Sequence, residues 1–374
     1  MKTLKDIKNG KGKRALVRVD YNVPIKGNKI LDTRRIDASF ATIKSLQKKG
    51  FQVQILAHLG DGSSSLKPIS LYLAKYFSVH FVTKPILEPA KKGALIQKLP
   101  KDTVVLFENI RRYPGEEKND PIFAKALAGL GDIFVNDAFS VSHRKHASVV
   151  GVTKYLPSYA GIQLEKETKT LSKLLDNKKH PFLFILGGAK FGTKIPLLKR
   201  FIETADQVVI TGAILNDFYK TAGFEVGISV IEDGYEKPIK KMLTSPKLLL
   251  PVDVIVIRGS KKVTVTAREV EKKDKIVDIG LESVRLISEK IKKAKVIVWN
   301  GPTGWYEGGF TWATTTLAKA MINSKAFSVI GGGDTGAVVE KIAENSKHIF
   351  ISTGGGATLD FLASGTLVGI KCLK

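Results

Sequence analysis

The chain has 374 residues, 43% of them hydrophobic and 25% charged, which is a composition typical of globular proteins. At about 150 residues per domain, this length predicts two domains. Sixty Lys and Arg against 35 Asp and Glu give a net charge of +25, a field that attracts polyanions. The excess is mostly Lys spread along the chain, with no basic block, zinc-finger spacing or basic aromatic stripe, so a solvated surface is favoured over a nucleic-acid site.

A single cysteine, Cys372, excludes an internal disulfide framework. The basic start of the chain is not followed by an apolar stretch, so we expect no secretory signal. No apolar run approaches the roughly 20 residues that a membrane helix needs. The expectation is therefore a cytoplasmic monomer without membrane association.

Short apolar runs alternate with amphipathic stretches almost throughout, which predicts an α/β protein with doubly wound parallel sheets. Helical spacing is found at 42–50, 123–131 and 338–346, and several of these stretches end in Gly or Asn. Segment 225–274 is less regular, and its order stays uncertain. The runs that predict strands are 51–58, 103–108, 182–187, 207–212, 295–300, 326–331 and 347–352.

The expected domain boundary lies near Leu156-Pro157-Ser158. The stretch 160–177 that follows has apolar residues at helical spacing, and we interpret it as a helix that joins the two domains. Its apolar positions are Ile162, Leu164, Leu171, Leu174 and Leu175.

In the first half, the strand-like runs end in Arg and His, whose fixed charges suit a small, highly charged acid. Each of these residues alone is more often a surface ion pair, but many of them fall beside predicted strand ends, where open α/β sheets bind ligands. Asp20 and Asn22 flank an aromatic residue in the same region. The basic set is Arg18, Arg35, His58, Arg111, His143, Arg144 and His146.

In the second half, the runs end in glycine, which suits a polyphosphate bound by backbone N–H groups at a helix start. GGGDTG (331–336) fits the dinucleotide fingerprint, yet no acidic residue ends the one strand that follows. A phosphate cradle or a tight turn is therefore favoured over nicotinamide binding. Asp334 among phosphate-binding amides suits Mg²⁺, and a helix N-cap is an equal alternative. The consecutive glycines of STGGGAT (352–358) also favour a binding role.

Two further loops carry charged candidates. GGAKFGTK (187–194) resembles a P-loop only loosely, but it places Lys190 and Lys194 four residues apart, where a helix would stack them as a clamp for a phosphoryl group. Either lysine alone is more often a surface residue. Glu307 in NGPTGWYE suits ribose hydroxyls. No serine-nucleophile elbow, HExxH motif or zinc-like spacing is present, so the sequence does not favour a covalent nucleophile.

The blocks RVDYNVP, ENIRRYPGEEKNDP, VNDAFSVSHRKHAS, GGAKFGTKI, WNGPTG, GGGDTG and STGGGAT, in this order, resemble the phosphoglycerate kinase family. The resemblance runs nearly from end to end. It implies two Rossmann-like domains joined by a helical hinge: residues 1–158 for phosphoglycerate, and 159–355 for the nucleotide, with hinge helix 159–177. It further implies a tail, 356–374, that returns to the first domain.

The resemblance implies reversible phosphoryl transfer between 1,3-bisphosphoglycerate and Mg-ADP, giving 3-phosphoglycerate and Mg-ATP. It places Asp20, Asn22, Arg35, His58, Arg111 and Arg144 on the phosphoglycerate. It places Lys194, Gly280, Glu307, Gly332, Gly333, Asp334 and Thr335 on the nucleotide, with Asp334 near Mg²⁺. It assigns the transferring group to Arg35, Lys190, Lys194 and the glycine amides of 353–356, which include Gly354 and Gly355.

Several positions depart from the family pattern. Asp61 stands where an Arg is usual, which exchanges a cation for an anion near the acid's phosphate. Gly192-Thr193, Ser140-Val141 and Thr303 replace the usual Ser-Asp, Gly-Thr and Met. These departures leave open an alternative from the binding class, a catalytically weakened member that holds polyanions such as RNA. A nicotinamide oxidoreductase is a third hypothesis, which rests on one fingerprint.

Overall fold

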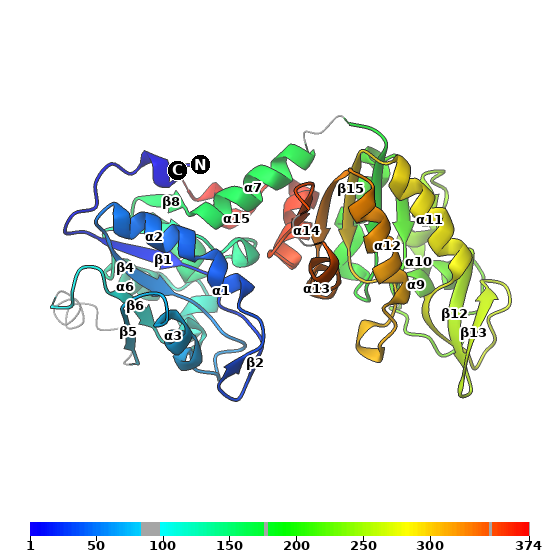
Figure 1. Ribbon diagram of the computed structural model, residues 1–374, viewed down its shortest axis with the longest axis horizontal. Coiled ribbons are helices and arrows are strands. Elements are labelled where there is room, and N and C mark those ends of the chain that lie inside the picture. Colours follow the sequence, from blue (N-terminus) through cyan, green and yellow to red (C-terminus); the bar gives the residue numbers. More distant parts are fainter. Residues whose placement is uncertain (84–97, 176–178, 344–345, 374) are drawn as a thin grey trace. The chain divides into compact units, whose positions relative to one another are not determined.

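The computed structural model describes residues 1–83, 98–175, 179–343 and 346–373 (Figure 1). The chain divides into two compact units: unit 1, Met1–Thr170 with Ser364–Lys374, and unit 2, Leu171–Ala363. Both divisions fall later than the sequence placed them, inside α7 (Ile162–Leu175) and at the end of α14 (Gly356–Ser364). The start of α7 belongs to unit 1 because the Asp137 carboxylate accepts from the Gln163 N–H at 2.8 Å, and Leu164 is buried.

Unit 1 is built on a six-stranded sheet in the order β5-β6-β4-β1-β7-β8, in which every pairing is parallel. The predicted strands 51–58 and 103–108 and the helices 42–50 and 123–131 are confirmed. The strands are β1 (Arg14–Arg18), β4 (Gln52–Leu56), β5 (Val79–Val82), β6 (Val104–Phe107), β7 (Ile133–Asn136) and β8 (Ser158–Ala160). The helices are α1 (Arg34–Ala38), α2 (Phe40–Lys48), α3 (Lys67–Leu73), α5 (Pro114–Glu117), α6 (Pro121–Ala128) and α15 (Val368–Lys371).

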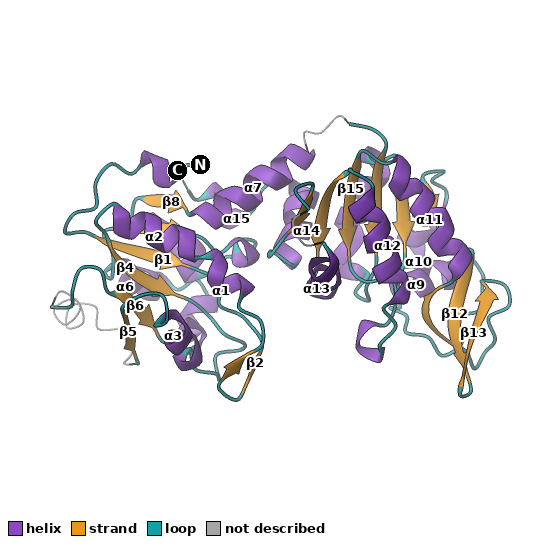
Figure 2. Cartoon of the chain, in the orientation of Figure 1, coloured by secondary structure: helices purple, strands orange, loops and turns teal. Residues whose placement is uncertain are grey.

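Unit 2 contains a second all-parallel sheet, in the order β11-β10-β9-β15-β16-β17 (Figure 2). The predicted doubly wound α/β class is therefore confirmed. The strands are β9 (Phe182–Leu186), β10 (Gln207–Ile210), β11 (Leu248–Leu249), β15 (Val296–Asn300), β16 (Phe327–Gly331) and β17 (Ile349–Ile351). The helices are α8 (Ile195–Thr204), α9 (Ile214–Thr221), α10 (Glu236–Leu243), α11 (Leu281–Lys293), α12 (Trp312–Asn323) and α13 (Gly333–Ile342). Residues 344–345 of the predicted helix 338–346 lie outside the described residues.

The irregular segment 225–274 folds partly into an antiparallel sheet in the order β13-β12-β14, beside the parallel sheet of unit 2. Its strands are β12 (Asp253–Arg258), β13 (Lys261–Thr266) and β14 (Lys275–Ile279). In β13 exposed lysines and threonines alternate with less exposed valines, as expected of a strand with one solvated face. A second small hairpin, in unit 1, pairs β2 (Ile25–Lys26) with β3 (Lys29–Ile30).

The central strands β9 and β15 are buried over their whole length, which explains why their sequences are almost continuously apolar rather than alternating. β4 is equally buried, although it contains Gln52 and Gln54. In unit 1 the C-terminal segment completes a small core: Val368 and Cys372 pack against Val141 and Val149. In the part of the chain that the structure describes, no helix combines the length and the apolar character needed to cross a membrane.

Candidate active site

The candidate residues of unit 1 follow the carboxyl ends of its parallel strands. Asp20 and Asn22 come after β1, where the Asp20 Oδ2 accepts from the Ser140 hydroxyl at 2.5 Å and pairs with Arg35 Nη1 at 3.1 Å. Arg35 also donates to the Asn22 carbonyl at 3.0 Å. Asp20 therefore aims the Arg35 guanidinium, and Ser140, a departure from the family pattern, contributes to this network.

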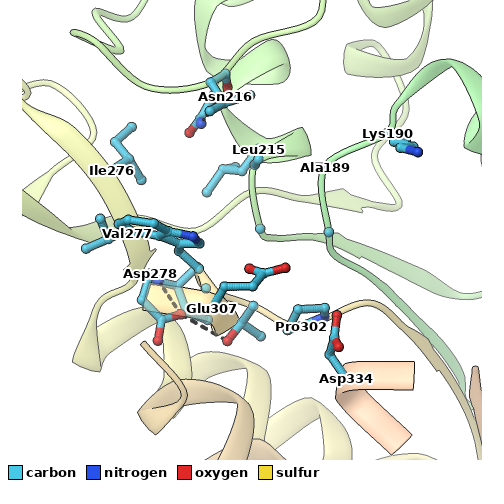
Figure 3. Close-up of a pocket in the computed structure, with 18 of the residues that line it drawn as sticks. Ala189, Lys190, Leu215, Asn216, Ile276, Val277, Asp278, Pro302, Glu307 and Asp334 are labelled. Atoms are coloured by element: carbon cyan, nitrogen blue, oxygen red, sulfur yellow. Dashed lines mark hydrogen bonds between the residues drawn. The ribbon is translucent and has the colours of Figure 1, made fainter. Parts of the chain in front are cut away.

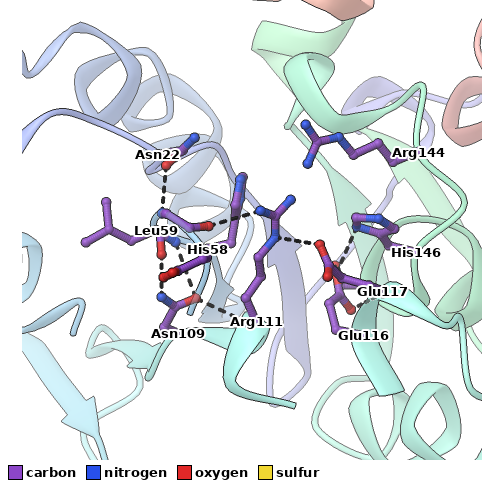
Figure 4. Close-up of polar contacts among 12 residues, drawn as sticks. Asn22, His58, Leu59, Asn109, Arg111, Glu116, Glu117, Arg144 and His146 are labelled. Carbon is purple, nitrogen blue, oxygen red and sulfur yellow. Dashed lines mark hydrogen bonds and ion pairs between the residues drawn. The ribbon is translucent and has the colours of Figure 1, made fainter. Parts of the chain in front are cut away.

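Arg111 is the centre of the second group (Figure 4). Its Nη1 donates to the Gly60 carbonyl at 3.0 Å, and its Nε pairs with Glu117 at 3.2 Å. The buried Asn109 holds the same loop, since its Nδ2 donates to the Leu59 carbonyl at 2.7 Å. The Asn22 side chain accepts from the Gly60 N–H at 2.9 Å. One hydrogen-bonded loop thus connects Asn22, Asn109 and Arg111.

The histidines lie among these arginines. Burial lowers the pKa of His58, and the neighbouring Arg18, Arg111 and Arg144 lower it further. Burial and the same arginines lower the pKa of His146 to about 4. Burial, with Arg111, also lowers the pKa of Arg144. We call Arg35, His58, Arg111, Arg144 and His146 the basic cluster; with neutral histidines, its positive charge comes from the three arginines.

Asp61 lies at the edge of this loop with an exposed side chain. Its Oδ1 accepts from the Ser63 N–H at 2.9 Å and from the Ser63 hydroxyl at 2.6 Å. These bonds, aided by Arg111, lower its pKa, so the group is a carboxylate at neutral pH. The anion is therefore built into a local turn, within reach of the Arg111 charge.

In unit 2 the loops after β9, β10 and β15 meet backbone to backbone. Gly188 donates to the Pro302 carbonyl at 3.1 Å, and Gly212 donates to the Thr303 carbonyl at 2.9 Å. Gly188, Gly212 and Gly301 have positive φ, and a Cβ on Gly212 would overlap the Gly188 nitrogen. Glycine is needed here because the backbones approach too closely for a side chain.

Lys194 belongs to this convergence. Its side chain is buried, its Nζ donates to the Gly187 carbonyl at 2.5 Å, and burial lowers its pKa to about 8. Lys190 is exposed on the preceding loop. The expectation that one helix face stacks both lysines is wrong, because α8 begins only at Ile195, after a 3₁₀ turn over Gly192–Lys194.

Both lysines line a pocket of about 620 Å³, a volume typical of small-molecule sites (Figure 3). One end is lined by Ile276 and Val277, and Lys190 and Asp334 lie at the other end, with Glu307 between them. An apolar end and a charged end fit the base and the phosphates of a nucleotide. We call this cavity the glycine pocket; its remaining polar lining includes Thr193, Lys194, Asn216, Lys275, Asp278 and Thr303.

Asp334 is the metal candidate. Burial and the nearby Glu307 raise its pKa, and no hydrogen bond or ion pair to it is found in the described ranges. In those ranges no three acidic, His or Cys side chains gather as a metal site. A partly buried carboxylate without a cation fits Mg²⁺, which usually binds one or two carboxylates and completes its shell with phosphates and water. Asp334 would hold the ion, and nucleotide oxygens would supply further ligands.

The other predicted residues have different surroundings. Thr335 is buried, and its hydroxyl has no partner among the described residues, as a ligand contact would leave it. Gly332 and Gly333 start α13, and Gly354 and Gly355 precede α14, at the ends of the paired strands β16 and β17. Gly280 does not line the pocket; it begins α11, where a Cβ would overlap the Asp253 carboxylate.

The sequence reasoning missed two buried networks. In the glycine pocket, Asp278 accepts from the Thr303 hydroxyl at 3.0 Å, Thr303 and Thr314 share a 2.9 Å bond, and burial raises the Asp278 pKa to about 6. Below the basic cluster, Glu116 and Ser148 bind each other. The one available signal was Thr303 itself, a polar residue in place of the usual Met.

Comparisons with known proteins agree with this architecture. A family profile described as "Phosphoglycerate kinase" matches residues 4–365. A curated phosphoglycerate kinase of Dictyoglomus turgidum is 39% identical, over 100% of this chain and 99% of its own. The solved phosphoglycerate kinase of Pyrococcus horikoshii has a TM-score of 0.87 at 29% identity, covering 100% of this chain and 98% of that one. The corresponding Coxiella burnetii structure has a TM-score of 0.83 at 33% identity, covering 99% and 97%. The chain therefore belongs to the phosphoglycerate kinase family of enzymes.

Proposed function

We propose that the protein transfers a phosphoryl group reversibly between 1,3-bisphosphoglycerate and Mg-ADP. In the forward direction the bond from phosphorus to the acyl oxygen breaks, and a bond to the terminal ADP oxygen forms. The products are 3-phosphoglycerate and Mg-ATP, as in glycolysis. The observation that carries the proposal is the glycine pocket, where a buried lysine and an unpaired carboxylate accompany backbone loops closed by glycines.

The basic cluster is the proposed site for the acid. Arg35, Arg111 and Arg144 supply positive charge, and Asp20 and Asn22 fix the Arg35 guanidinium and the loop at Gly60. Guanidinium forks bind carboxylate and phosphate oxygens through paired N–H groups. The cluster suits a substrate that carries a carboxylate and a phosphate.

The glycine pocket is the proposed site for the nucleotide. Lys190 and Lys194 would neutralise the transferring group, Glu307 would accept from ribose hydroxyls, and Gly354 and Gly355 would offer backbone N–H groups. Bound Mg²⁺ would supply charge neutralisation at the phosphates, held by Asp334. Transfer of this kind depends on positioning and charge rather than on a protein nucleophile. A hinge movement at α7 that excludes water completes the proposal.

A coupled assay with 3-phosphoglycerate and Mg-ATP tests it, with an Asp334→Asn, Lys194→Met double variant as the background control. Turnover that depends on both substrates and exceeds the control is expected. Absence of turnover at millimolar substrate would contradict the proposal. The comparisons do not favour the alternative of a polyanion-binding member. The physiological setting that we propose is a monomer in the cytoplasm.

A further inference from the structure

Arg18, the last residue of β1, is fully buried, and its Nε, Nη1 and Nη2 all contact protein atoms. Its Nε donates to the Ser148 hydroxyl oxygen at 2.9 Å, and its Nη1 donates to the Val19 carbonyl. Its Nη2 lies 3.1 Å from Nδ1 of His58. The guanidinium therefore connects the interior of unit 1 with one ring nitrogen of a candidate substrate residue.

The contact between Arg18 and His58 determines where the imidazole proton is. A guanidinium has five donors and no acceptor, so Nδ1 of His58 must accept. Nδ1 then carries no proton, and the neutral ring carries its proton on Nε2. Among the described residues no hydrogen bond to Nε2 is found, and Nε2 is not among the fully enclosed polar atoms that lack a partner. It is free to donate to a substrate oxygen.

The charges around His58 act in the same direction. Arg18, Arg111 and Arg144 carry positive charges near the ring and disfavour an imidazolium, whereas His146, with a pKa of about 4, is neutral from pH 5 to 8. Glu116 is hydrogen-bonded to Arg18 through Ser148, and its Oε1 lies 3.8 Å from Nδ1 of His146. Asp20 adds a second negative charge near Arg18. The acids of this region pair with or act on the arginines, so the charges that act on the His58 ring itself are positive, and the neutral ring is the stable form.

Arg18 is held by a second, buried pair. The Ser148 hydroxyl donates to Oε1 of Glu116 at 2.5 Å, and the Ser148 N–H donates to Oε2 at 2.9 Å. Glu116 is fully buried, so the carboxylate and the guanidinium compensate each other through one hydroxyl. Since the hydroxyl proton goes to Glu116, the Ser148 oxygen must accept from Arg18, which fixes the guanidinium plane.

We propose that Arg18, oriented by Ser148 and Glu116, is a positioning residue that holds His58 in the neutral Nε2–H form as a donor to the acidic substrate. The inference rests on the proposed function for its substrate, but its structural part does not need activity. The contribution of His58 to binding is then constant from pH 5 to 8, whereas an ordinary histidine, with a pKa of about 6.5, changes charge in this range.

Imidazole ¹⁵N and ¹³C shifts of the labelled full chain test the proposal directly. The His58→Gln variant assigns the His58 signals, and the exposed His80 is the internal reference. The expected result is the neutral Nε2–H tautomer of His58 at every pH from 5 to 8. An Nδ1–H tautomer, or a titration in this range, would overturn the proposal.

The Ser148→Ala variant tests the connection to Glu116. We expect altered His58 shifts and a KM for 3-phosphoglycerate raised about threefold to tenfold, with kcat changed much less, since one hydrogen bond to a charged group is lost. Ser142→Ala, which removes another buried hydroxyl of unit 1, should change neither quantity. Unchanged shifts and KM in Ser148→Ala would overturn the role of Ser148. The wild-type spectra answer the tautomer question even if Ser148→Ala does not fold, and missing turnover with the expected spectra would count against the proposed function alone.

Discussion

The Lys194 ammonium and the Gly187 carbonyl form a 2.5 Å hydrogen bond inside the glycine pocket, and burial lowers the Lys194 pKa to about 8. Only the protonated lysine can neutralise a phosphoryl group. We therefore expect kcat/KM for Mg-ATP to fall as the pH rises through about 8, because this parameter reports the free enzyme. A pH profile from 6 to 10 checks this, and a flat profile to pH 10 would contradict it.

Replacing Lys194 with Met should lower kcat/KM at least about tenfold, which corresponds to about 1.4 kcal/mol of lost transition-state stabilisation. In this variant kcat/KM for Mg-ATP should no longer fall as the pH rises through about 8. Lys199→Met, an exposed lysine on α8, is the matched control and should behave as wild type. An unchanged rate in Lys194→Met would remove Lys194 from the proposed mechanism.

Gly212→Ala should destabilise unit 2, since Gly212 has φ +64° and a Cβ would overlap the Gly188 nitrogen. Strain of φ alone costs about 1 kcal/mol or more, and forced backbone shifts add about 1–3 kcal/mol. Gly223→Ala is the control: φ is +91°, but nothing lies within 4 Å of a Cβ there. Urea unfolding of both variants measures the difference, and equal losses would contradict the packing argument.

Asp61→Arg should lower the KM for 3-phosphoglycerate by up to about fivefold, since an exposed charge pair contributes at most about 1 kcal/mol. The gain should shrink with added salt, which screens exposed charges. Asp61→Asn separates the two effects, because its side-chain oxygen still accepts from Ser63 while the charge is gone. A KM that is equal or higher in Asp61→Arg would mean that the carboxylate does not weaken binding.

Asp334→Asn should raise the Mg²⁺ concentration for half-maximal rate, because an amide oxygen is a weaker ligand than a carboxylate. The rate at saturating Mg²⁺ should recover in part. Glu307→Gln is the comparison, since the same pocket loses a carboxylate that we assign to ribose. Identical Mg²⁺ curves for Asp334→Asn and wild type would exclude Asp334 as the ligand.

Asp278 makes a prediction about stability. Burial raises its folded pKa to about 6 from 3.8, so the folded state binds the proton more tightly than the unfolded state between these values. Its contribution to stability is therefore lost as the pH rises from about 4 to about 6. As the pH rises through this window, the free energy of unfolding of Asp278→Asn should increase by about 2–3 kcal/mol relative to that of wild type. Denaturant unfolding of wild type and Asp278→Asn at pH 4 and 7 measures this difference. An equal change of stability in the two proteins between these pH values would contradict the prediction.

Much of the fold follows from the sequence. The runs at 182–187 and 295–300 predict β9 and β15 because strands buried on both faces must be apolar throughout. The antiparallel pairing of β12 with β13 and β14 was not predicted, because segment 225–274 shows no regular pattern, although Arg258 and Lys261 pair across a two-residue turn. The prediction that Lys190 and Lys194 stack on one helix face was wrong for a local reason. A spacing of four residues stacks two side chains only inside a helix, and α8 begins after both lysines.

The site residues show a similar division. Arg111 and Asp334 could be proposed as site residues from the sequence because both follow the ends of predicted strands, where open α/β sheets bind ligands. Glu116 and Ser148 were not, because a buried acid and a serine 32 residues later look unremarkable in a sequence. Their relation exists only when α5 and the segment after His146 pack together.

The C-terminal segment 364–374 packs in unit 1, and this determines which fragments of the gene can encode a complete unit 1. Neither fragment 1–170 nor a fragment that ends before Ser364 contains Val368 and Cys372, which pack against Val141 and Val149. Both fragments also lose the 2.8 Å hydrogen bond from the Gly369 N–H to the Ser142 carbonyl. Unit 1 is therefore not encoded by one continuous stretch of the gene. A circular permutant that joins residues 364–374 directly to Met1 would make unit 1 a single reading frame.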